Sequence, residues 1–179
     1  TSIAKCMFFQ KNNTIWLGTT HSTYLYTTNP ELHLLTTKRI ECYNVTKNDS
    51  GTVWINQGVD FCMLERQVNS IIIKKTIKLK TKILSFCKDS SDNLWAGTIN
   101  GLWLYQHDSL LYYGNKYHLL SHRINDIKLD EGSLWMATND TGIIIKTGSH
   151  LLHITTYDGL HSNFCQCIYV DYKKTVCVG

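Results

Sequence analysis

The sequence predicts an all-β protein of the β-propeller class, in which small antiparallel sheets, the blades, stack beside one another. Three observations support this prediction. A short motif containing tryptophan recurs along the chain, the segments around each copy alternate apolar and polar residues, and the composition favours strands. The 179 residues include ten Tyr and five Trp but only one Pro, and aromatic residues are enriched in strands.

The repeated motif is an aliphatic residue, Trp, any residue, Gly or Ala, and then Thr. Three complete copies lie at 15–19, 94–98 and 134–138. A degenerate copy lies at 53–57, and a copy with Cys in place of Trp lies at 176–179. The central positions 16, 54, 95, 135 and 177 are 38, 41, 40 and 42 residues apart. Such a period is typical of propeller blades. A β-sandwich is the alternative, but sandwich strands rarely repeat a motif at a fixed period.

Each repeat contains four expected strands. In the fourth repeat, an alternating segment at 124–130 precedes the motif, and apolar segments at 142–146 and 151–154 follow it. This order predicts four antiparallel four-stranded blades and a partial fifth. Their approximate limits are 1–38, 39–80, 81–121, 122–162 and 163–179. Because the last motif ends at Gly179, we expect a piece of a longer array whose exposed blade faces contact a partner.

The residues of the motif have a physical explanation in this fold. A large, flat Trp side chain can fill the wedge between neighbouring blades. The small Gly or Ala two positions later permits the next sheet to approach closely. One blade cannot bury both of its faces alone, so the blades are expected to stack.

The run YDGLHSNFCQCIYVDYKKTVCVG, from Tyr157 to Gly179, resembles the two-component regulator propeller repeat. It contains Asp-Gly-Leu, a small residue and Asn, an alternating strand, and Asp with a turn before the motif. Weaker copies begin at His118 and Asp89, so the resemblance covers essentially the whole chain. The sequence departs from the repeat in three places: the second copy lacks Gly-Thr, the fifth lacks Trp, and Asp-Gly-Leu before the strand occurs only at 158–160.

This resemblance implies a function. Such repeats build the extracytoplasmic sensor regions of hybrid two-component regulators, many of which respond to glycan breakdown products. The resemblance therefore implies a periplasmic part of an inner-membrane protein, with an oligosaccharide as its ligand. The implied partners are the remaining blades and domains of the sensor and a second copy of the chain. The motif identifies the scaffold and not the ligand.

Charge and cysteine content exclude several kinds of site. The formal net charge of +4 comes from basic residues that form no single stripe, which argues against binding of nucleic acid. The seven cysteines form no CxxC pair and have no spacing that suits zinc, so no metal or other cofactor is expected. We expect these cysteines to be mostly reduced and buried, as small apolar residues. Cys165 and Cys167 should share one face of a strand.

No group of residues has the pattern of a catalytic centre, so this segment is not expected to be an enzyme. Asp126 and Asp130 are four residues apart in an expected strand, which is too distant for an acid–base pair. Asp130 matches the turn aspartate of the repeat and is expected to accept hydrogen bonds from the backbone. A propeller lyase or hydrolase and a structural platform for protein–protein contacts are the alternatives to a sensor.

The densest positive charge lies at 74–82. Lys78, Lys80 and Lys82 alternate with Ile77 and Leu79, which predicts three ammonium groups on one strand face. Lysines on an outermost strand discourage edge-to-edge aggregation, and we favour this interpretation. A platform for an anionic glycan is the alternative.

A ligand surface is predicted at one end of the blades. There, the loops between second and third strands lie beside the loops that join consecutive blades, and several blades can each contribute a polar group. Their amide, imidazole and guanidinium donors suit sugar hydroxyls or carboxylates, and Tyr157 or Trp103 can offer a stacking face. The candidates are His21, Asn100, Asn139 and Asp140 in loops of the first kind and Arg39, Lys82, His122, Arg123, His161 and Asn163 in loops of the second kind. Ordinary polar loop chemistry is the alternative explanation for them.

Overall fold

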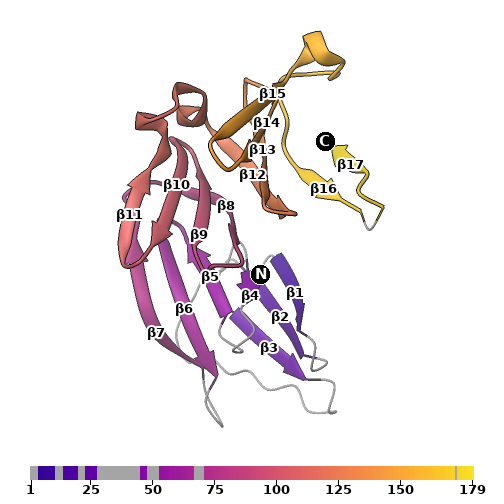
Figure 1. The fold of residues 1–179 in the computed structure, drawn as a ribbon. Coiled ribbons are helices and arrows are strands. Elements are labelled where there is room, and N and C mark those ends of the chain that lie inside the picture. Colours follow the sequence, from indigo (N-terminus) through magenta and orange to yellow (C-terminus); the bar gives the residue numbers. More distant parts are fainter. Residues whose placement is uncertain are drawn as a thin grey trace. The chain divides into compact units, whose positions relative to one another are not determined.

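The computed structural model describes residues 4–10, 14–19, 23–27, 45–47, 53–66, 71–171 and 173–179. The chain forms two compact units, 1–80 and 81–179. Both are built from antiparallel sheets, which Figure 1 colours from indigo to yellow along the chain. The only helical elements among the described residues are three 3-10 helices of three or four residues. The predicted all-β class is therefore confirmed.

The first unit contains two sheets, of order β1-β2-β3 and β4-β5-β6-β7. The motif forms the second strand of each sheet, as expected. The side chains of Val53, Ile55 and Phe61, on the two middle strands of the larger sheet, are fully buried. The strands are β1 (Ala4–Gln10), β2 (Thr14–Thr19), β3 (Thr23–Thr27), β4 (Val45–Lys47), β5 (Val53–Gln57), β6 (Asp60–Arg66) and β7 (Ile71–Lys78).

The expected lysine-bearing strand is shorter than predicted. Strand β7 is the last strand of its sheet, as the edge interpretation requires, but it ends at Lys78. Lys80 has a positive φ of 61° and leaves the strand direction. Leu79 remains buried, and its backbone N–H donates to the Val59 carbonyl at 3.0 Å. Alternating burial therefore continues past the strand, whereas the single flat row of three ammonium groups does not form.

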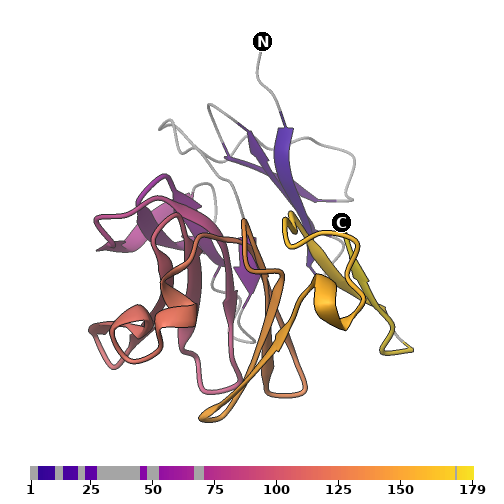
Figure 2. The same ribbon diagram turned by 90° about the horizontal axis from the view of Figure 1, so that it is seen from above.

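The second unit contains two four-stranded sheets and a hairpin, of order β11-β10-β9-β8, β12-β13-β14-β15 and β16-β17. Strand β12 contacts β8 of the sheet before it and β16 of the hairpin after it, and the three sheets follow one another in Figure 2. The strands are β8 (Ile83–Lys88), β9 (Leu94–Thr98), β10 (Gly101–Gln106), β11 (Ser109–Tyr112), β12 (Ile124–Asp130), β13 (Ser133–Thr138), β14 (Ile143–Thr147), β15 (His150–Ile154), β16 (Ile168–Val170) and β17 (Val176–Val178). The 3-10 helices are η1 (Tyr113–Asn115), η2 (His118–Ser121) and η3 (Thr156–Asp158).

The motif packs the second unit in the way that its residues predict. Trp95 of β9 lies in one apolar cluster with Leu134 and Ile144 of the next sheet. A Cβ added at Gly97 would lie only 2.6 Å from Cγ2 of Ile124 on β12. A side chain at this position would push the two sheets apart, so glycine permits the close approach.

The same arrangement is repeated one sheet further along the chain. Ala137, at the position of Gly97, is fully buried in a cluster with Cys165 and Ile168 of the hairpin region. Trp135, at the position of Trp95, packs on this cluster but is only half-buried. The wedge role of the tryptophan is thus confirmed at both sheet boundaries of the second unit.

The cysteine predictions are only partly correct. Among the described cysteine side chains, all five are free thiols; Cys62 and Cys165 are buried and Cys87 is half-buried, but Cys167 and Cys177 are exposed. Cys165 and Cys167 do not share a strand face, because β16 begins only at Ile168 and the irregular backbone before it turns one thiol inward and the other outward. Cys42 and the side chain of Cys6 lie outside the described residues.

The prediction for Asp130 is wrong. Its carboxylate accepts a hydrogen bond from Lys174 Nζ at 2.6 Å rather than from the backbone. Asp130 and Ser133 pair across a two-residue turn in which Glu131 and Gly132 both have positive φ, of 46° and 77°. Such a tight hairpin turn leaves no loop amide for the carboxylate to bind. The turn from Asp89 to Asn93 is longer, and there the expected bonding occurs, as described below.

Candidate functional site

The predicted ligand surface lies at the end of the second unit where its sheets are joined, and we call this end the joining face. It comprises Lys82 and Asn100, His122 and Arg123, Asn139 and Asp140, and the segment 160–163. Backbone hydrogen bonds connect the two kinds of loop: Ile99 N donates to the Lys82 carbonyl at 3.2 Å, and Asn139 N donates to the Arg123 carbonyl at 3.0 Å. The two kinds of loop are therefore adjacent at both positions, as predicted.

Buried threonines hold the loops of the joining face in shape. The motif residue Thr98 is fully buried, and its hydroxyl donates to the Gly101 carbonyl at 2.8 Å and accepts from Asn100 N at 3.1 Å. Thr138 makes the equivalent contacts with the Gly142 carbonyl at 2.7 Å and Thr141 N at 3.0 Å. The threonine of the motif thus fixes the loop that carries a candidate ligand residue.

The glycine after each of these loops is required by its surroundings. Gly101 has a φ of 105°, and a Cβ there would lie 2.3 Å from the Leu120 carbonyl oxygen. Gly142 has a φ of 80° and lies equally close to the Ile154 carbonyl oxygen. A left-handed backbone against a neighbouring carbonyl accepts no other residue without strain. These loops are consequently rigid supports.

His122 and Asp140 form the central pair of the joining face. The Nδ1 atom of His122 lies 3.1 and 3.2 Å from the two carboxylate oxygens of Asp140. The edge of the His118 ring packs against the His122 ring, with their centroids 5.6 Å apart. A carboxylate that holds Nδ1 fixes the orientation of an imidazole and leaves Nε2 for another partner. The side chain of Asp140 is 57% exposed, so this pair faces solvent.

Arg123 and Asn163 are partly used by the protein itself. Nε of Arg123 donates to Asn125 Oδ1 at 2.9 Å, and Nδ2 of Asn125 donates to the Cys165 carbonyl at 2.9 Å. The Asn163 side-chain oxygen accepts from Thr156 N at 2.9 Å, and its carbonyl accepts from Gly142 N at 2.8 Å. Arg123 is exposed and retains the outer donors of its guanidinium group, whereas Asn163 mainly orders the loop.

The loop around η3 presents an aromatic side chain on a fixed backbone. Thr155 and Asp158 form a reciprocal capping box, in which the Asp158 carboxylate accepts from the N–H and hydroxyl of Thr155. These hydrogen bonds lower the pKa of Asp158. Tyr157, between them, is 98% exposed. By contrast, Trp103 is half-buried against Tyr112, with ring centroids 4.9 Å apart, so Tyr157 is the better stacking surface.

Two candidates, His21 and Arg39, lie outside the described residues. The others occupy the joining face but do not form one cluster. Hydrogen bonds bring His122 to Asp140 and Arg123 to Asn139, and the exposed Lys82 and Asn100 lie at the preceding sheet. His161 is exposed beside Leu160, which approaches Gly142.

Sequence reasoning missed Asp126, whose carboxylate connects three sheets. Its Oδ1 accepts from the Ser85 hydroxyl on β8 at 2.7 Å, and its Oδ2 accepts from Ile168 N on β16 at 3.1 Å. Lys128 Nζ lies 3.2 Å from the same Oδ1. Ser85 and Asp126 each come directly after an irregularity in strand pairing, so they occupy equivalent positions in consecutive repeats. Their spacing of 41 residues was the signal in the sequence that could have indicated this contact.

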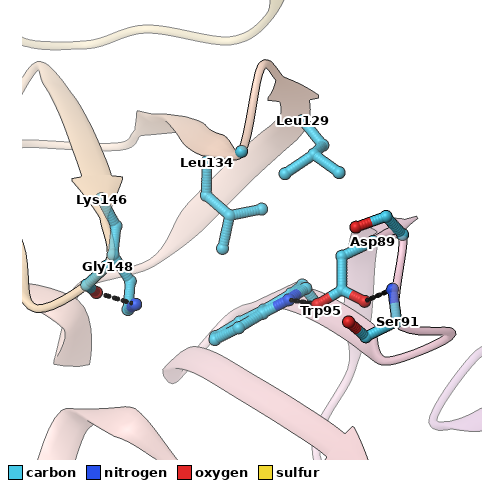
Figure 3. Close-up of a pocket in the computed structure, with 9 residues that line it drawn as sticks. Asp89, Ser91, Trp95, Leu129, Leu134, Lys146 and Gly148 are labelled. Carbon is cyan, nitrogen blue, oxygen red and sulfur yellow. Dashed lines mark hydrogen bonds between the residues drawn. The ribbon is translucent and has the colours of Figure 1, made fainter.

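A cavity was also missed, at the opposite end of the second unit, which we call the hairpin face. It has a volume of about 330 Å³ and lies between the β8–β9 turn and the next sheet (Figure 3). Its lining includes Trp95, Lys146 and, across from Lys146, Asp89.

No group of three His, Cys, Asp or Glu side chains suited to a metal occurs among the described residues. None of the helices that the structure describes is long and apolar enough to cross a membrane.

The chain matches no known family model and no curated protein. Among solved structures, it is similar to the extracellular domains of two hybrid two-component systems from B. thetaiotaomicron. One is 18% identical with a TM-score of 0.79, the other 17% with a TM-score of 0.73, and each comparison covers 98% of this chain and 26% of the other. The fold is a β-propeller. Virginiamycin B lyase from Staphylococcus aureus is also similar, with 13% identity, a TM-score of 0.74, and coverage of 98% of this chain and 62% of the lyase.

These comparisons confirm the propeller class, and two of the similar structures come from the kind of protein that the repeat motif resembles. At these identities the likeness concerns the fold. The chain spans about a quarter of the length of the sensor domains. The same scaffold occurs in sensors and in a lyase, so the function must be argued from the side chains.

Proposed function

We propose that the chain is part of the extracytoplasmic ligand-sensing propeller of a hybrid two-component protein. The observation that carries this proposal is the agreement between two independent likenesses. The repeat motif resembles that of two-component regulator propellers, and the fold over 98% of the chain matches two extracellular domains of such systems. The proposal places the chain in the periplasm as part of an inner-membrane protein. The remaining blades and domains, and a second copy of the protein, are its proposed partners.

The proposed ligand is an oligosaccharide bound on the joining face. Arg123 offers the outer donors of a guanidinium group, His122 offers Nε2, and Asn100 and Asn139 offer amides on rigid loops. Such donors suit hydroxyl and carboxylate groups of sugars. Tyr157 can stack on a sugar ring, because its backbone is fixed and its side chain is exposed. Lys82, Asp140, His161 and Asn163, with His21 and Arg39, complete the proposed surface. The proposal includes no cofactor.

A lyase is the second candidate, and the His122–Asp140 pair is the observation that favours it. A histidine oriented by a carboxylate can remove a proton through its free nitrogen. A similar fold occurs in virginiamycin B lyase. Among the described residues, however, no second acid or base lies in hydrogen-bond contact with this pair. We therefore favour binding over catalysis.

The test is binding of a panel of oligosaccharides to the intact protein by isothermal titration calorimetry. A ligand found in this way is then titrated against R123A, H161A and Y157A. His150→Ala is the matched control for His161→Ala, because His150 is also exposed but lies at the hairpin face. Loss of one charged hydrogen bond is expected to weaken binding by about tenfold.

Three outcomes are informative. Weaker binding in the joining-face variants but not in H150A supports the proposal. Unchanged affinity in R123A, H161A and Y157A, with all three proteins folded, contradicts this placement of the ligand. If the protein turns over a glycan and H122Q loses this turnover, a lyase replaces the sensor as the proposed function.

A further inference from the structure

The cavity at the hairpin face contains a buried cation without a carboxylate partner. Lys146 of β14 is only 8% exposed and lines the cavity. Its Nζ donates to the Gly148 carbonyl. Among the described residues, no carboxylate pairs with Lys146. A lysine this far buried is usually paired with an anion.

Aromatic rings replace the missing carboxylate only in part. Lys146 Nζ lies 5.1 Å from the ring centroid of Trp95 and 5.3 Å from that of Tyr113. Cation–π contacts compensate some of the lost hydration of an ammonium group. An ammonium group has three donors, and one of them is bound to Gly148. Burial and the positive charge of Lys116 both lower the pKa of Lys146. An anion in the cavity would relieve both effects.

The Asp89 carboxylate, which also lines the cavity, is fully used elsewhere. Asp89 accepts from Ser91 N at 2.9 Å and Asn93 N at 3.0 Å through Oδ1, and from Asn93 Nδ2 and Trp95 Nε1, each at 3.0 Å, through Oδ2. Burial alone would raise the pKa of Asp89, but these hydrogen bonds lower it. Asp89 therefore fixes the Trp95 ring and has no lone pair free for a cation.

The cavity has a cationic end and, opposite it, an end that carries serine hydroxyls beside the Asp89 carboxylate. Figure 3 shows the Trp95 ring along one wall and Leu134 and Leu129 opposite it. Lys146 lies at one end, and Ser91 lies at the other, beside Asp89. Ser90 also lines this second end. The volume of about 330 Å³ is at the lower limit of small-molecule sites.

We propose that this cavity binds a small hydroxylated monocarboxylate, with its carboxylate on Lys146 and its hydroxyl-bearing body between Trp95 and the serines. A single cation facing a fixed carboxylate suits one negative charge. A phosphate group carries nearly two charges and is normally held by several cationic or backbone donors. The site lies at the other end of the sheets from the joining face and does not depend on the proposed oligosaccharide ligand.

The probes are D-glucuronate and D-glucose, which share a ring but differ by one carboxylate, titrated into the full chain by calorimetry. Lys146→Met keeps the apolar stem and removes the charge, whereas Lys146→Arg keeps a cation. Lys173→Met is the matched control, because Lys173 is an exposed lysine of the same unit that does not line the cavity. We expect D-glucuronate to bind at least about tenfold more tightly than D-glucose, and K146M to lose at least about tenfold in affinity. K173M and K146R should bind within about threefold of the unchanged protein.

A second measurement needs no folded K146M variant. Isotopic labelling of lysine side-chain nitrogens gives a resonance for Lys146 that K146R identifies by its absence. D-glucuronate should shift this resonance, and D-glucose should not. The proposal is overturned if neither sugar binds, if D-glucose binds equally well, if folded K146M keeps its affinity, or if the Lys146 resonance does not move at saturation.

Discussion

Replacing Asp126 by alanine should destabilise the second unit strongly, although Asp126 belongs to neither proposed ligand site. Its two carboxylate oxygens accept hydrogen bonds from two other sheets, from Ser85 on β8 at 2.7 Å and from the Ile168 amide on β16 at 3.1 Å. The side chain is only 15% exposed. In D126A, water can replace the lost carboxylate at the Ser85 hydroxyl and the Ile168 amide only in part.

The magnitude follows from the two hydrogen bonds. A hydrogen bond to a charged group contributes about 1.5–3 kcal/mol, so two at the lower limit predict a loss of about 3 kcal/mol in the free energy of unfolding. This is a large part of the total stability of about 5–15 kcal/mol that is usual for a domain. Asp126→Asn should cost less, about 1–2 kcal/mol, because the amide oxygen still satisfies one donor while its NH₂ group meets the other.

The assay is urea unfolding followed by circular dichroism and tryptophan fluorescence. Asp140→Ala is the matched control, since among the described residues this exposed carboxylate pairs with His122 alone, and its loss should cost less than about 1 kcal/mol. A double-mutant cycle of Asp126→Ala with Ser85→Ala should give a coupling energy of about 1 kcal/mol. If D126A unfolds within about 0.5 kcal/mol of the unchanged protein, or no less stably than D140A, the three-sheet connection does not stabilise the fold.

Three further predictions concern packing and thiol chemistry. Gly97→Ala should lower the free energy of unfolding in urea by about 2–3 kcal/mol, because its Cβ would lie 2.6 Å from Ile124 Cγ2. Gly132→Ala should cost only about 1 kcal/mol, because its Cβ meets nothing within 4 Å although its φ is 77°. Equal costs for the two variants would contradict the close approach at Gly97. Burial raises the pKa of Cys87 from 9.0 to about 12, so its contribution to stability is complete below pH 9.0 and is lost as the pH rises toward about 12. The free energy of unfolding should differ less between pH 8 and pH 10 in Cys87→Ala than in the unchanged protein. An equal difference would count against the burial of the Cys87 thiol. Iodoacetamide should label Cys167 and Cys177 in the folded protein before Cys62 or Cys165, since only the first two are exposed.

The parts of the fold that repeat could be predicted from sequence. The Trp and the small residue of the motif each act between neighbouring sheets, and both occur at the same offset in successive copies, as at Trp95 with Gly97 and Trp135 with Ala137. The loops that carry Asn100 and Asn139 could be placed for the same reason, because each follows the motif directly. The periodicity also explains why His122 was predicted on the same surface as Asp140, 18 residues away.

The features that the sequence did not predict correctly depend on the length of a turn or on contacts between different sheets. Asp130 resembles Asp89 in sequence position, but a two-residue turn follows Asp130 and a longer loop follows Asp89. Cys167 looks apolar and strand-like, yet the strand begins one residue later. The role of Asp126 requires partners 41 and 42 residues away on two different strands, and nothing in a single strand pattern specifies them.

The two proposed sites differ in how binding would act on the fold. Side chains of the joining face lie on loops that are already held by Thr98, Thr138 and the glycines that follow them, so a ligand there changes few internal contacts. The cavity of the hairpin face is lined by Trp95 from one sheet and Lys146 from the next, and Trp95 is also the wedge between these sheets. An anion on Lys146 would satisfy a charge that the packed sheets leave without a carboxylate, and so would stabilise the sheet boundary itself. Ligand at 100 times its dissociation constant stabilises the folded state by about 2.7 kcal/mol, which is comparable to the contribution of Asp126 on the same pair of sheets. Of the two sites, the cavity is therefore the one at which binding changes how firmly one blade is held against the next.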